Sequence, residues 1–178
     1  MRGLVLYESK YGATERYARW LSEDTGFDLA KVSEVDAGSL PQYDVVVLGG
    51  GVYASGIAGL SFLRRHLGAL RGKRLIVFCC GASPYEEAAF EAIVAHNLKG
   101  ELQGIPCFYC RGAFDMKRMS FRDRTLCRLL RKAVSKKDPK DYELWESALM
   151  SVDEGEAKDW TDRAYLEPIL REIARPLS

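Results

Sequence analysis

The fold of this chain is decided near its start, by the stretch Ser9-Lys10-Tyr11-Gly12-Ala13-Thr14. A short apolar run, residues 4–7, precedes it, and Tyr17, Ala18 and Leu21 follow it at helical spacing. This pattern predicts a buried strand, a tight loop and a helix. The first N–H groups of such a helix have no partner within the helix, and the helix dipole favours negative charge there. We therefore interpret the stretch as a cradle for a phosphate group.

The residue types of this loop suit an anion. Gly12 lets the backbone curl without a Cβ in the way, and the hydroxyls of Ser9 and Thr14 can add hydrogen-bond donors. The alternative is an ordinary turn between a strand and a helix, with Thr14 as the helix cap. A P-loop is excluded because no Gly-Lys-Ser/Thr triplet ends the stretch.

Length and composition limit the possible classes of protein. The 178 residues predict one domain, 1–178, with a sizeable core. No apolar run approaches the ~20 residues of a membrane span. Five cysteines and the lack of a secretory signal predict a cytoplasmic location. The net charge of +1 gives no indication of a nucleic-acid partner.

Further apolar runs predict a parallel α/β sheet. Strands are expected at residues 27–32, 44–49, 73–80 and 106–110, and helices near 60–70, 86–97 and 162–174. Residues 36–43 leave room for one turn of helix. The helix at 86–97 is expected to turn four side chains inward, those of Ala89, Phe90, Ile93 and Val94. Strands that alternate with helices form a sheet covered on both faces.

Three loops are expected to meet at one end of this sheet. They are residues 9–14, the glycine-rich stretch 50–56 and residues 81–85, and each follows the carboxyl end of a strand. Ligands of such sheets bind beyond the carboxyl ends of the strands, where the strand order reverses. The three loops therefore predict one ligand site.

These loops resemble those of the flavodoxins. The pattern Ser9-x-x-Gly12-x-Thr14 resembles the flavodoxin phosphate loop, and residues 49–56 resemble the first flavin loop. The second flavin loop is matched by Cys80-Gly81-x-Ser83-x-Tyr85-Glu86. Flavodoxins are themselves the usual example of strand order 2-1-3-4-5 with FMN at the switch point. The resemblance thus implies a doubly wound, five-stranded parallel sheet of that order and an FMN cofactor.

The resemblance also implies roles for individual residues. The loop 9–14 would hold the FMN phosphate, and Gly50 and Gly51 would let the backbone approach the flavin N5. Tyr85 and Tyr53 are candidates to stack on the ring, with a core position as the alternative for each. The full cofactor-binding set is Ser9, Lys10, Tyr11, Gly12, Ala13, Thr14, Gly50, Gly51, Val52, Tyr53, Ala54, Cys80, Gly81, Ala82, Ser83 and Tyr85. The sequence identifies no catalytic acid or base and no metal ligands.

The chain departs from the electron-carrying flavodoxins. Those proteins are strongly acidic, whereas this chain is nearly neutral, and Ala82 stands where many of them have an acidic residue. These departures resemble the menaquinone-dependent protoporphyrinogen dehydrogenases of bacteria, a branch of the flavodoxin superfamily that serves heme biosynthesis. The resemblance implies an FMN-dependent dehydrogenase that passes electrons to a quinone. The alternative is a flavodoxin-type electron carrier without a substrate of its own.

An insertion of about residues 113–160 is expected after the fifth strand. Residues 111–137 hold ten Lys or Arg against two Asp, and residues 138–162 hold nine acids against two Lys. An apolar helical stripe lies within the basic part: Phe121, Leu126, Leu129, Leu130 and Val134. Such a helix can lie peripherally on the inner face of an anionic membrane or bind a redox partner protein, so we expect docking and not flavin binding. The alternative is a basic helix that pairs with its acidic neighbour.

The cysteines are expected to be structural. Cys107 and Cys110 have C-x-x-C spacing, but residues three apart on a strand face opposite sides of the sheet. A metal site or a redox pair is therefore not expected there. Cys79 and Cys80 are expected in the core, with Cys80 near the flavin.

Overall fold

The apolar runs of the sequence form the strands of one sheet in this computed structural model, which describes residues 1–153 and 155–176. The strands of this sheet are β1 (Gly3–Glu8), β2 (Asp28–Lys31), β3 (Val45–Tyr53), β4 (Gly56–Ile57), β5 (Arg74–Gly81) and β6 (Cys107–Arg111), and a separate pair consists of β7 (Ala113–Asp115) and β8 (Ala157–Asp159). The α-helices are α1 (Ala13–Thr25), α2 (Leu60–Arg65), α3 (Leu67–Leu70), α4 (Glu87–Asn97), α5 (Phe121–Val134), α6 (Leu144–Met150) and α7 (Glu167–Ala174). Short 3-10 helices are η1 (Ala37–Gln42), η2 (Gly100–Leu102), η3 (Met116–Arg118), η4 (Pro139–Asp141) and η5 (Arg163–Leu166).

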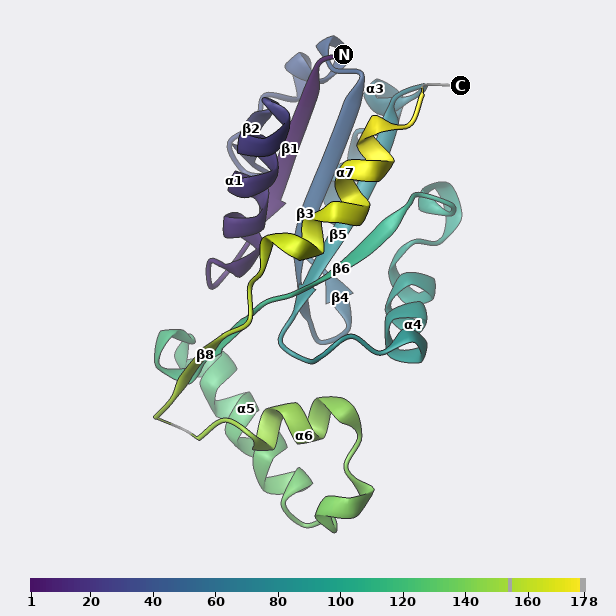
Figure 1. Ribbon diagram of the computed structural model, residues 1–178. Helices are drawn as coiled ribbons and strands as arrows, with labels where there is room; N and C mark the ends of the chain where they lie inside the picture. Colours follow the sequence, from purple (N-terminus) through teal and green to yellow (C-terminus); the bar gives the residue numbers. More distant parts are fainter. Residues whose placement is uncertain (154, 177–178) are drawn as a thin grey trace.

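The main sheet is parallel and has the order β2-β1-β3-β5-β6, with β4 paired antiparallel to β3. Side chains of a strand alternate between the two faces, so the unbroken apolar run of β3 fills both layers of the core. Val45 and Val47 face α1, η5 and α7, whereas Val46 and Leu48 face α2, α3 and α4. Figure 1 shows these helices on the two faces of the sheet. The predicted fold class and the order of the five parallel strands are confirmed.

The glycine-rich stretch after the central strand is not the loop that the sequence predicts. β3 continues to Tyr53 and turns back through Ala54 and Ser55 into β4. The glycines are needed because neighbouring groups approach the strand closely. A Cβ at Gly49 would stand 2.1 Å from the Phe78 ring, and a Cβ at Gly50 would stand 2.2 Å from the Ala58 carbonyl oxygen. The loop itself is only the turn at Ala54 and Ser55, whose φ angles are 46° and 65°.

Two helices also differ from their predictions. The helix expected at 60–70 breaks at His66, which ends α2 and precedes α3. In α4, Phe90, Ile93 and Val94 pack on the core as expected, but Ala89 is exposed and lines a cavity instead of the core. The last helix begins as the 3-10 turn η5 and becomes α-helical at Glu167.

The region between β6 and η5 forms a separate lobe, defined here as the insertion, residues 113–159. Figure 1 shows it beyond the carboxyl ends of the parallel strands. It leaves and returns through the antiparallel pair of β7 and β8, in which Ala113 faces Asp159. Within the described residues, no helix is long and apolar enough to cross a membrane.

The close approach at Gly50 predicts a sharp effect of one methyl group. Gly50→Ala should lower the free energy of unfolding by about 1–3 kcal/mol, because the carbonyl of Ala58 belongs to the backbone and cannot rotate away. Urea unfolding followed by circular dichroism measures the change. Gly68→Ala is the matched control, since a Cβ there meets no atom within 4 Å and alanine favours α3. Equal stability of the two variants would contradict this account of β3.

Candidate functional site

The loop between β1 and α1 has the geometry of an anion site. Gly12 precedes the helix with a φ of 96°, and no side chain caps the helix there. The alternative with Thr14 as the cap is therefore wrong, because Thr14 lies inside the first turn and is buried. Ser9 Oγ accepts a hydrogen bond of 3.0 Å from the Gly12 N–H, and this bond stabilises the turn of the loop. An uncapped helix start with its dipole offers N–H groups to a phosphate.

Tyr53 lies against this loop. Its hydroxyl oxygen accepts a 3.0 Å hydrogen bond from the Lys10 N–H, and its ring lies edge-on to that of Tyr11. Gly51 makes this possible, because a Cβ there would stand 2.4 Å from the Tyr53 hydroxyl. Burial raises the pKa of Tyr53, so its hydroxyl stays protonated and remains able to donate. Tyr53 thus joins β3 to the phosphate loop, and its stacking on a flavin stays a prediction.

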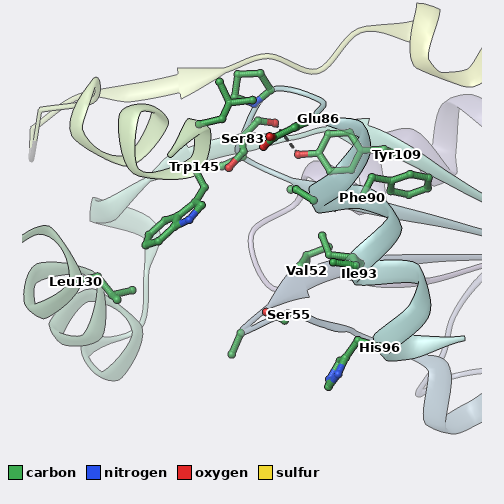
Figure 2. Close-up of a pocket in the computed structure, with 17 residues that line it drawn as sticks. Val52, Ser55, Ser83, Glu86, Phe90, Ile93, His96, Tyr109, Leu130 and Trp145 are labelled. Carbon is green, nitrogen blue, oxygen red and sulfur yellow. Dashed lines mark hydrogen bonds between the residues drawn. The ribbon is translucent and has the colours of Figure 1, made fainter. Parts of the chain in front are cut away.

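A cavity of about 710 Å³ opens beside the ends of β3 and β5. Figure 2 shows its two walls, one from the core and one from the insertion. The core wall comes from β3, the turn after it, the loop after β5, α4 and β6: Val52, Ala54, Ser55, Gly81, Ala82, Ser83, Pro84, Glu86, Ala89, Phe90, Ala92, Ile93, His96 and Tyr109. The insertion wall consists of Leu130, Leu144 and Trp145. A largely apolar cavity of this size with a few polar groups is typical of a small-molecule site.

The cofactor-binding residues predicted from the sequence are divided between the cavity and the loop 9–14. Five of them line the cavity: Val52, Ala54, Gly81, Ala82 and Ser83. Residues 9–14, the predicted phosphate loop, lie outside that lining. Tyr85 also lies outside it, half-exposed and packed against Phe90 and Tyr109 at centroid distances of 5.7 and 6.0 Å. Its stacking role stays a prediction, and Phe90 and Tyr109 are the rings of this cluster that line the cavity.

Sequence reasoning missed the wall that the insertion supplies. Leu130 belongs to a stripe that the sequence assigns to docking, and Trp145 lies in an acidic segment to which the sequence gives no role. The one available signal is Trp145 itself, since a large aromatic side chain in a polar stretch indicates a contact. Trp145 is 41% exposed.

The insertion also contacts the phosphate loop, so the expectation that it is separate from the flavin loops is wrong. Asp123 of α5 accepts hydrogen bonds from the Tyr11 hydroxyl and from Lys10 Nζ. The Tyr11 hydroxyl, aided by Lys10, holds the pKa of Asp123 below its ordinary value. Arg124 and Arg131, expected on a docking surface, instead donate to backbone carbonyls of the insertion.

The cysteines form contacts across neighbouring strands. Cys80 faces Cys110 between β5 and β6, and burial raises the pKa of the Cys110 thiol well above its ordinary value. Cys107 packs on the opposite face, as predicted for residues three apart on a strand. In the part of the chain that the structure describes, no cluster of His, Cys, Asp and Glu could hold a metal ion.

Comparison with known proteins agrees with this architecture. A family model described as "Flavodoxin domain" matches residues 4–143, which is more than half of the chain. No curated protein matches the chain. A flavodoxin from the domain Archaea is 15% identical, with 72% of this chain and 92% of that chain covered and a TM-score of 0.43. A WrbA-like protein from Agrobacterium tumefaciens is 17% identical, with 72% and 90% covered and a TM-score of 0.45. At such values these two likenesses carry no argument about function.

The residues present fit FMN, the cofactor of the matching family. The uncapped start of α1 suits the phosphate, and the apolar cavity beside Val52 and Gly81 has room for a ring. Bound there, FMN would be held by the loop 9–14 at its phosphate and by the ends of β3 and β5 at its ring. The family match supports the prediction of FMN from the sequence.

The left-handed conformation at Gly12 predicts a selective loss of cofactor. Gly12→Ala should remove most bound FMN, because a side chain strains this turn and displaces the N–H groups. Flavin absorbance per protein in the purified sample measures the loss. Gly26→Ala is the matched control at the other end of α1: its φ is 70°, and the added Cβ meets open space. Both variants should lose about 1–2 kcal/mol of stability, but Gly26→Ala should retain FMN. Full FMN content in Gly12→Ala would refute the phosphate loop.

Proposed function

This chain belongs to the flavodoxin domain family, and on that premise we propose that it is an FMN-dependent dehydrogenase that oxidises its own substrate and passes the electrons to a quinone. One observation carries the proposal. The insertion places Leu130 and Trp145 across from the loops that would hold the flavin ring, so that a cavity of about 710 Å³ lies between them. An electron carrier needs an exposed ring edge for its partners, whereas an enzyme needs room for a substrate beside the ring.

Each turnover of the proposed reaction transfers two electrons and two protons. A porphyrinogen loses them from its macrocycle, and a quinone gains them and becomes a quinol. FMN supplies the redox chemistry when bound. The apolar side chains of Phe90, Ile93 and Leu130 exclude water and contact a flat, apolar ring. Ser83 and Glu86 offer oxygen atoms at one end of the cavity, and His96 offers ring nitrogens at the other.

The basic segment, residues 111–137, supports a substrate with carboxylate groups. Residues 111–137 hold ten Lys or Arg against Asp115 and Asp123. A cationic segment of this kind attracts carboxylates from a distance and raises the rate of association. A protoporphyrinogen has both properties, an apolar macrocycle and carboxylate side groups, so we propose it as the substrate class, by resemblance to protoporphyrinogen dehydrogenase.

The proposed activity is tested with the purified holoprotein and a cavity variant. Under anaerobic conditions, protoporphyrinogen should bleach the flavin absorbance at 450 nm, about where FMN absorbs, and menaquinone should restore it.

Leu130→Gln should raise the KM for porphyrinogen severalfold, since it places an amide in the apolar wall. Leu129→Gln is the matched control, because the neighbouring leucine does not line the cavity. No bleaching by porphyrinogen in wild type would refute the substrate. Equal KM values in the two variants would refute the cavity as its site.

We also propose that the outer face of α5 contacts an anionic membrane, where a quinone dissolves. Phe121, Leu126 and Leu129 are 84%, 53% and 61% exposed. Arg122 and Lys132 lie among them at helical spacing and are also exposed. Exposed apolar side chains between cations are typical of helices that lie on lipid surfaces. The acidic segment contacts the basic segment through the ion pair of Glu146 with Lys137 and through the Leu149 and Val152 carbonyls, which accept hydrogen bonds from Arg131.

Membrane contact predicts a charge-dependent affinity for vesicles. The pair of changes Arg122→Glu and Lys132→Glu should lower binding to phosphatidylglycerol vesicles by more than about tenfold, because each cation near such a surface contributes about 1 kcal/mol. Vesicle sedimentation at several salt concentrations measures it. The control is Arg65→Glu with Arg71→Glu, exposed cations beside α3 at the opposite end of the sheet. An equal loss in both double variants would leave only a net-charge effect and would refute docking by α5.

A further inference from the structure

Arg118 of the insertion lies over the phosphate loop. Its Nη2 atom is 3.8 Å from the position that a Cβ at Gly12 would occupy. Gly12 directly precedes the uncapped first turn of α1. A guanidinium group therefore stands at the place where N–H groups and the helix dipole already favour an anion.

The insertion holds this arginine in place from two sides. Arg124 donates from Nε to the Met116 carbonyl at 2.9 Å and from Nη2 to the Lys117 carbonyl at 2.8 Å, and these bonds join η3 to α5. One residue before Arg124, the Asp123 carboxylate accepts from the Tyr11 hydroxyl and from Lys10 Nζ, the latter at 3.3 Å. The position of Arg118 is thus set by contacts that join the insertion to the phosphate loop itself.

Arg118 differs from the other well-placed arginines of the insertion in what it contacts. Arg124 and Arg131 are each occupied by backbone carbonyls. Among the residues that the structure describes, no carboxylate or carbonyl oxygen accepts a hydrogen bond from the Arg118 side chain, which is exposed. An arginine that is positioned by others but has no acceptor is suited to an incoming anion. Its planar guanidinium group can donate two parallel hydrogen bonds to two oxygens of a phosphate.

We propose that Arg118 binds the FMN phosphate and that the basic insertion is therefore part of the cofactor site. A flavin phosphate carries a charge of about −2 at neutral pH, which Lys10 and the N–H groups of α1 neutralise only in part. Asp123 and Tyr11 act as positioning residues that bring Arg118 over Gly12. The inference rests on FMN as the cofactor but not on the substrate of the proposed function.

A consequence is reciprocal coupling between the cofactor and the cavity. If the phosphate stabilises the position of η3 and α5, it also stabilises the wall that carries Leu130. By thermodynamic linkage, the insertion then raises the affinity for FMN by the same factor. Flavins without a phosphate should not produce this effect.

The test compares FMN with riboflavin, which has the same ring and no phosphate. Dissociation constants are measured by flavin fluorescence on the full-length apoprotein. Arg118→Gln should weaken FMN by about tenfold to a hundredfold, the range for a hydrogen bond to a charged group, and should leave riboflavin unchanged. Arg118→Lys should recover part of the affinity. Arg122→Gln, which removes the same charge from an exposed position of α5, should change neither constant.

A second measurement follows hydrogen exchange in residues 116–134. FMN should slow exchange there in wild type but not in Arg118→Gln, and riboflavin should slow it in neither. The proposal is overturned if Arg118→Gln binds FMN as tightly as wild type, if both flavins weaken equally, or if Arg122→Gln has the same effect. A wild-type protein that binds neither flavin would refute the FMN assignment as well. A protein that binds FMN through Arg118 but oxidises no porphyrinogen would refute only the proposed function.

Discussion

The structure depends on how closely other groups approach the backbone of β3. Three consecutive glycines leave room for the Phe78 ring at Gly49, for the Ala58 carbonyl at Gly50 and for the Tyr53 hydroxyl at Gly51. The first contact packs the core, the second fixes the return of the chain into β4, and the third lets Tyr53 reach the phosphate loop. One run of residues without Cβ atoms therefore sets the core, the turn and the position of the site.

The sequence predicts the sheet well because its signals are local. An unbroken apolar run such as 44–48 has few alternatives to a buried strand. A glycine directly before the start of a helix likewise indicates an anion loop from neighbouring residues alone. The same local reasoning fails at residues 49–53. Glycine indicates a loop by propensity, whereas here it is required by neighbours that are distant in the sequence. Propensity alone cannot distinguish these two causes.

The sequence predicts a basic helix with an apolar stripe in the insertion but not its place in the fold, for a similar reason. Its composition indicates a basic helix but not where that helix lies. The contact of Asp123 with Tyr11 joins residues 112 positions apart and has no local signature. The cavity wall formed by Leu130 and Trp145 follows from that placement. The charges of one short segment also serve different ends: Arg124 and Arg131 hold the lobe together, Arg118 faces the loop 9–14, and Arg122 faces outward.

The antiparallel pair of β7 and β8 has a consequence for how such a protein can change over generations. Because Ala113 and Asp159 lie opposite each other, the lobe begins and ends at one point of the core. Lengthening a segment whose ends already meet adds only a small closure entropy, about 0.6 kcal/mol for each doubling. Recombination could thus exchange or resize the whole lobe while every strand of the parallel sheet keeps its register. The β7–β8 pair is therefore a position at which an insertion with a different binding specificity can replace this one without a change in the sheet.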